Sequence, residues 1–185
     1  MNDIKFSVLK VRLSVSFWFI AVVALYVIVF ENSLYVLLAV ILHESAHMLL
    51  IYLLGAWVLE INLNITDINI KANTLILGRV GRLAVALAGP TANLLACYIA
   101  TLVGNEAVFG INMIIAIFQL VPCCGSDGGE VLGIIMGKYG KSVLKITSYI
   151  SSLAVIALAV AMLFEGDVNI SLVLAVFYIV FMACK

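Results

Sequence analysis

The stretch LYVLLAVILHESAHMLLIYLL, residues 34–54, decides the fold, because it places a polar cluster inside an apolar run long enough to cross a bilayer. Its centre, His43-Glu44-Ser45-Ala46-His47, follows the HExxH pattern and contains the only two histidines of the chain. Residues four apart share one helix face, so both imidazoles can bind one metal ion, with Glu44 close to a metal-bound water. Ionisable groups at membrane depth each cost roughly 2.5–3.5 kcal/mol and are usually functional. We therefore predict a metal site here rather than a structural cluster.

The composition predicts a mainly α-helical, polytopic membrane protein. The chain has 185 residues, of which 65% are hydrophobic. We expect one membrane-embedded domain over residues 1–185, with a core at 34–129, additional spans within 146–185 and no PDZ or CBS domain. The apolar runs predict about six transmembrane helices, near residues 14–30, 34–54, 83–103, 107–121, 146–164 and 168–184.

Residues 57–77 carry a different pattern. Apolar and polar residues alternate from Leu59 to Thr66, which is the period of a β-strand, and the phase then slips at Thr66-Asp67. A turn or bulge followed by a second short strand is the simplest interpretation, so we predict a small membrane-associated β-hairpin or sheet. Residues 4–15 alternate in part and also fit a strand at the membrane surface.

The basic residues predict the orientation in the membrane. With a cytoplasmic N-terminus, the inner segments are 1–13, 55–82 and 125–145 together with Lys185, and the outer loops carry only acidic charges. This asymmetry follows the positive-inside rule and predicts a multi-pass protein with both termini in the cytoplasm. The inner segments hold all ten Lys and Arg residues: Lys5, Lys10, Arg12, Lys71, Arg79, Arg82, Lys138, Lys141, Lys145 and Lys185.

A catalytic zinc site commonly has three protein ligands and an open position for water. The HExxH pattern supplies two, and no third histidine exists. Asp127 is the strongest candidate for the third ligand, because it lies at a polar break in a helix and two glycines follow it. Cys123 and Cys124 remain alternatives, since thiolates also bind zinc. We expect one zinc ion per chain, with Glu44 as the general base that takes the proton of the attacking water.

Three motifs resemble those of the site-2 proteases, which are intramembrane zinc metalloproteases, and in particular the small branch that includes a sporulation protease. They are HExxH at residues 43–47, Ala88-Gly89-Pro90-Thr91-Ala92-Asn93, similar to AGPxAN, and residues 119–129, similar to NxxPxxxxDGG. The resemblance implies Asp127 as the third ligand, zinc as the metal and an unwound membrane helix as the substrate. The family has Asn where this chain has Gln119, so Asn93 and Gln119 are the candidates for contacts with the substrate or the oxyanion.

The function predicted from the sequence is therefore an intramembrane zinc endopeptidase that cleaves a membrane-spanning or membrane-associated protein near the cytoplasmic face. The resemblance suggests a membrane-tethered transcription-factor precursor or an anti-sigma factor as the substrate. We expect contact with the lipid bilayer and none with nucleic acid, and the oligomeric state stays open. The alternative is a metal-bearing membrane protein that binds or chaperones partners without catalysis, against which Glu44 argues, because binding alone needs no general base.

The alternating segment also suggests how a substrate binds. A protease must cut an extended segment, and an exposed strand edge can pair with one through main-chain hydrogen bonds. We expect such a docking edge at Asn62, Leu63, Asn64 and Ile65, just after the HExxH helix.

Overall fold

The computed structural model describes residues 4–8, 11–64 and 68–164. The chain divides into two compact units, Met1–Ala116 and Ile117–Lys185. The expectation of a single domain stays a prediction. The first unit contains β1 (Ile4–Val8), β2 (Val11–Val15), α1 (Phe17–Val29), α2 (Ser33–Leu53), β3 (Val58–Leu63), β4 (Ile68–Ala72), a 3-10 turn (Thr74–Ile76), α3 (Arg79–Val103) and most of α4 (Glu106–Leu120).

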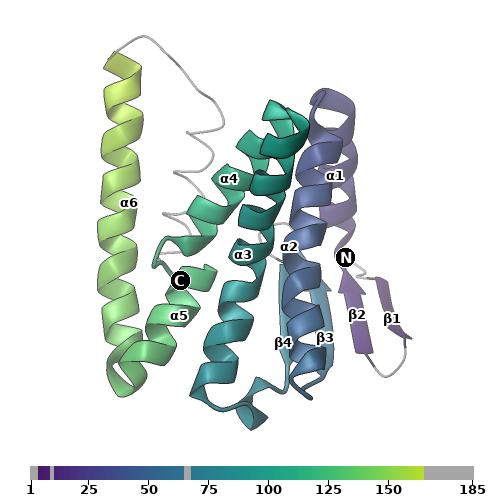
Figure 1. Ribbon diagram of the computed structural model, residues 1–185, viewed down its shortest axis with the longest axis vertical. Coiled ribbons are helices and arrows are strands. Elements are labelled where there is room, and N and C mark those ends of the chain that lie inside the picture. The colour runs from purple at the N-terminus through teal and green to yellow at the C-terminus, as the bar shows by residue number, and fades with distance from the viewer. Residues whose placement is uncertain (1–3, 9–10, 65–67, 165–185) are drawn as a thin grey trace. The chain divides into compact units, whose positions relative to one another are not determined.

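Helices α2 and α3 lie side by side and form the centre of the first unit (Figure 1). Small residues line the buried face of α3, including Ala86, Gly89 and Ala100, so the two backbones can approach closely. The helix α2 ends at Leu53, and Gly55 follows with φ 78°, the left-handed conformation that glycine adopts at low cost. Gly55 thus allows the chain to turn directly after the helix.

The four strands form one sheet in the order β1-β2-β3-β4. Strands β3 and β4 are the antiparallel pair predicted from the alternation at 57–77, and β2 pairs with β3 in parallel. Glu60 on β3 lies 4.0 Å from Arg12 on β2 and accepts a 3.1 Å hydrogen bond from Lys71 on β4. That hydrogen bond holds the pKa of Glu60 below its usual value. One carboxylate thus joins three strands.

The expected docking edge at Asn62, Leu63, Asn64 and Ile65 is wrong at its first two residues, which do not lie at an edge of the sheet. Asn62 pairs with Ser14 on one side and Asn69 on the other, and Leu63 likewise has partners on both sides. Asn64 follows the strand, and Ile65 lies outside the described residues. The two outer strands of the described sheet are β1 and β4. Strand β2 lies next to β3, and the sequence analysis did not predict this neighbour.

Among the described residues, two helices are long and apolar enough to cross a membrane, Ser33–Leu53 and Arg79–Val103. They correspond to two of the six predicted spans. The first and fourth predicted spans are shorter apolar helices, α1 and α4, and α1 begins only at Phe17 because β2 uses the residues up to Val15. The sixth predicted span, 168–184, lies outside the described residues. The count of six therefore stays a prediction.

The second unit contains the end of α4, α5 (Asp127–Met136), a 3-10 turn (Gly137–Tyr139) and α6 (Gly140–Phe164). The sequence predicted a polar segment at 125–145 followed by a span at 146–164. In the structure, α5 occupies much of the first segment, and α6 begins at Gly140 and ends at Phe164, where the predicted span ends. Within the unit, α5 packs against α6, and the Ser148 hydroxyl on α6 accepts a 2.8 Å hydrogen bond from the Cys124 backbone N–H.

Candidate metal centre

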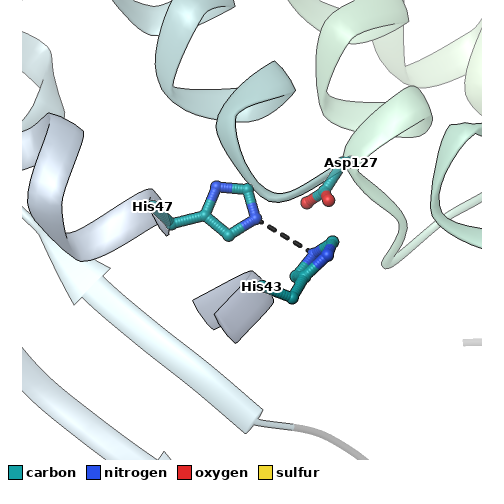
Figure 2. A group of neighbouring side chains, drawn as sticks. All are labelled: His43, His47 and Asp127. Atoms are coloured by element: carbon teal, nitrogen blue, oxygen red, sulfur yellow. Dashed lines mark hydrogen bonds between the residues drawn. The ribbon is translucent and has the colours of Figure 1, made fainter. Parts of the chain in front are cut away.

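The two histidines lie one turn apart on α2, and their rings meet edge to face (Figure 2). The two Nε2 atoms are 3.2 Å apart. Two imidazole nitrogens bound to one tetrahedral zinc ion at its usual bond lengths are separated by about 3.3 Å. The spacing of the pair therefore fits two ligands of a single metal ion.

Each ring is held at its other nitrogen by an oxygen. Nδ1 of His47 lies 2.8 Å from the carbonyl oxygen of Val85, and Nδ1 of His43 lies 2.5 Å from Oδ1 of Asn93. An oxygen of this kind only accepts, so each Nδ1 carries a proton and each neutral ring presents an Nε2 lone pair. This is the tautomer that a metal ligand needs, and such partners commonly orient metal-binding histidines.

These tautomers leave both Nε2 atoms able to bind a metal ion. Two neutral rings protonated at Nδ1 have no proton to share across the 3.2 Å between their Nε2 atoms. A single metal ion could bind both Nε2 atoms at this spacing. His43 is only 2% exposed, so the first ligand lies inside the protein.

Gly89 on α3 leaves room for the rings. A Cβ at this position would overlap the Nε2 atoms of both His43 and His47. The glycine of the Ala88–Asn93 motif thus keeps open the space beside the two lone pairs. The sequence marked this motif by resemblance only, and the contact between α2 and α3 supplies its physical reason.

Asn93 on α3 contacts the first histidine. It is fully buried, and its amide joins His43 to the carbonyl oxygen of Ala39 and to Asn112. These contacts place the Asn93 amide behind the His43 ring, and its predicted role at the substrate or oxyanion stays a prediction. Asn112 on α4 was missed by the sequence reasoning, because no local pattern links it to a histidine 69 positions earlier.

Glu44 follows His43 on α2 and lines an apolar cleft of about 550 Å³. The cleft lies within the first unit, between α1 and α2 and the strands β3 and β4. Its walls include Met48 from α2, Ile61 from β3 and Ile70 from β4. The predicted general base therefore borders a space lined almost entirely by apolar side chains.

Asp127 is the first residue of α5 in the second unit and is the third side chain drawn in Figure 2. Ser126 caps this helix and accepts a 3.0 Å hydrogen bond from the backbone N–H of Gly129. A Cβ at Gly128 would collide with the Leu120 carbonyl oxygen, and one at Gly129 with that of Cys123. The two glycines thus let the first turn of α5 lie against the preceding loop, which fixes the backbone of Asp127.

The other predicted residues of this unit are half-buried. Gln119 lies in the last turn of α4, and Cys123 and Cys124 lie in the loop before α5 as free thiols. The roles of Gln119 and Asp127 stay predictions. The donor set of two imidazoles and a carboxylate is one that zinc accepts.

No protein-family model matches this sequence, and no curated protein matches it. Among solved structures, the chain is similar to the site-2 protease from Methanocaldococcus jannaschii, with a TM-score of 0.67 and 20% sequence identity. The similarity covers 98% of this chain and 94% of that one. It agrees with the resemblance carried by the three sequence motifs. The chain has the fold of that site-2 protease over nearly its whole length.

Proposed function

We propose that the chain is an intramembrane zinc metalloendopeptidase of the site-2 protease family. The observation that carries the proposal is the pair of Nε2 atoms 3.2 Å apart, with both Nδ1 atoms held by oxygens and with Glu44 next in sequence. Binding alone needs two or three ligands and no adjacent carboxylate. The likeness in fold and the order of the three motifs support the same function.

His43, His47 and Asp127 are the proposed ligands of one zinc ion. The two histidines supply the pair described above, and the capped start of α5 holds the Asp127 backbone for the third bond. When bound, zinc activates a water molecule and polarises the carbonyl of the peptide bond. Glu44 takes the proton of the attacking water and passes it to the leaving amine.

The substrate is proposed to be a membrane-spanning or membrane-associated protein, cut near the cytoplasmic face. The apolar cleft beside Glu44 suits apolar side chains of an unwound membrane segment. The two apolar helices and the distribution of basic residues support a multi-pass protein with cytoplasmic termini. A membrane-tethered transcription-factor precursor or an anti-sigma factor is the kind of substrate that the family resemblance suggests.

Reconstituted protein tests the proposal. The purified chain is placed in liposomes with a panel of single-span test proteins, and the products are identified by mass spectrometry. We expect cleavage within or beside the apolar segment, its loss on treatment with a zinc chelator and its return with added zinc. Zinc binding without cleavage of any test protein would favour the non-catalytic alternative, and the absence of bound zinc would contradict both.

A further inference from the structure

A chain of buried hydrogen bonds runs from α4 to the first histidine. Nδ2 of Asn112 donates to the Val108 carbonyl oxygen at 2.9 Å, and Oδ1 of Asn112 accepts from Nδ2 of Asn93 at 2.8 Å. Oδ1 of Asn93 in turn faces Nδ1 of His43 at 2.5 Å. All three side chains are at most 4% exposed, so water does not compete for these bonds.

The donor-to-acceptor direction of this series of hydrogen bonds is set at the Val108 carbonyl. The Val108 carbonyl can only accept, so the Asn112 amide must turn its NH₂ group towards it and its oxygen towards Asn93. The Asn93 amide must then turn its NH₂ group towards Asn112 and its oxygen towards His43. Reversing Asn93 alone would place its oxygen against the Asn112 oxygen, which costs about 1–3 kcal/mol per buried unsatisfied group.

We propose that Asn112 is a positioning residue that fixes the tautomer of His43 for metal binding. This inference rests on the proposed role of His43 as a zinc ligand. With the Asn93 oxygen facing the ring, His43 is protonated at Nδ1 and offers its Nε2 lone pair to the metal. A reversed Asn93 amide would donate to Nδ1 and leave the proton on Nε2, where it blocks the bond. The Ala39 carbonyl also accepts from Asn93, but at the longer distance of 3.3 Å, so Asn112 is the stronger constraint.

His47 provides a control within the same molecule. Its Nδ1 faces the backbone carbonyl of Val85, which cannot turn over, so its tautomer does not depend on Asn112. Cys97 provides a second control. Its thiol donates to the Phe109 carbonyl at 3.5 Å, so it also joins α3 to α4, but it takes no part in the hydrogen bonds that lead to His43. A purely structural role for Asn112 would affect both histidines and would be mimicked by loss of the Cys97 contact.

Nitrogen-15 NMR of the full chain labelled at histidine tests the inference, since only two histidines contribute signals. Spectra of zinc-free protein in detergent are recorded at about pH 8.5, where imidazoles are neutral. We expect both wild-type rings to be protonated at Nδ1. In Asn112→Leu, His43 should become a mixture of tautomers while His47 is unchanged, and zinc affinity measured by chelator competition should fall on the order of 10-fold. Cys97→Ala should match the wild type in both measurements.

Asn112→Ala keeps the inference testable if the leucine variant fails to fold. Unchanged His43 tautomers in a folded Asn112 variant would overturn the inference, and so would equal changes at His43 and His47 or the same changes in Cys97→Ala. None of these measurements uses peptide cleavage. A protein that shows the tautomer shift but cuts no substrate would therefore refute the proposed function and leave the role of Asn112 intact.

Discussion

Gly89 lies where α3 meets the two imidazoles of α2, and a Cβ there would overlap both Nε2 atoms. Gly89→Ala should therefore lower zinc affinity on the order of 100-fold, by displacing the rings from the metal position. Gly110→Ala is the matched control, because it adds the same methyl group to a helix where nothing lies within 4 Å. Zinc content after purification and chelator competition measure both variants. Equal zinc affinity in the two variants would contradict the site geometry.

Asp127 is predicted to be the third zinc ligand. Asp127→Ala should reduce bound zinc to well below one ion per chain, because two imidazoles alone leave the ion weakly held. Cys123→Ser combined with Cys124→Ser should retain zinc, and it is the control from the same loop. Metal analysis of the purified variants compares them, and the opposite pattern would assign the third ligand to a cysteine.

At the scale of residues, the sequence predicted the parts of the site that follow from local spacing. His43 and His47 lie four apart and Glu44 lies between them, so one helix brings them together whatever surrounds it. Asn112 and the Val85 carbonyl could not be predicted in this way, because their contacts depend on how α2, α3 and α4 pack. Asn93 was noticed through its motif, but its place behind His43 depends on the same packing.

At the scale of elements, the interior position of β3 changes what a proline in this strand should do. Asn62 has strand partners on both sides, so Asn62→Pro removes a ladder hydrogen bond inside the sheet. We expect a loss of stability of roughly 3 kcal/mol rather than a selective loss of cleavage. Asn62→Ala, which keeps the backbone N–H, should unfold close to the wild-type temperature. Thermal unfolding in detergent compares the two, and a wild-type melting temperature for a folded Asn62→Pro would refute the pairing.

The sheet shows which elements a local pattern can predict. Alternation of apolar and polar residues predicted β3 and β4, and the weaker alternation at 4–15 predicted one strand where the structure has two, β1 and β2. The parallel pairing of β2 with β3 was not predictable, because α1 and α2 separate the two strands in the sequence. That long-range pairing is also why the expected docking edge was wrong.

At the scale of the whole molecule, the positive-inside pattern predicts both termini in the cytoplasm and six spans. Reporter fusions after Glu106 and after Lys185 test this prediction in the native membrane. The first should report the outer side and the second the cytoplasmic side. A fusion after Lys71 is a further control and should also report the cytoplasm. Signals from the same side at Glu106 and Lys185 would contradict the six-span topology.

The most direct test of the central claim compares wild-type protein with Glu44→Gln, using equal zinc loading and the same reconstituted substrate. Glutamine keeps the size of the side chain and removes the base, so zinc content should stay at one ion per chain. Cleavage should fall roughly 10²–10⁴-fold, the usual contribution of a general base. Cleavage by zinc-loaded Glu44→Gln at a rate close to that of the wild type would contradict the claim that this chain is a zinc peptidase with Glu44 as its base.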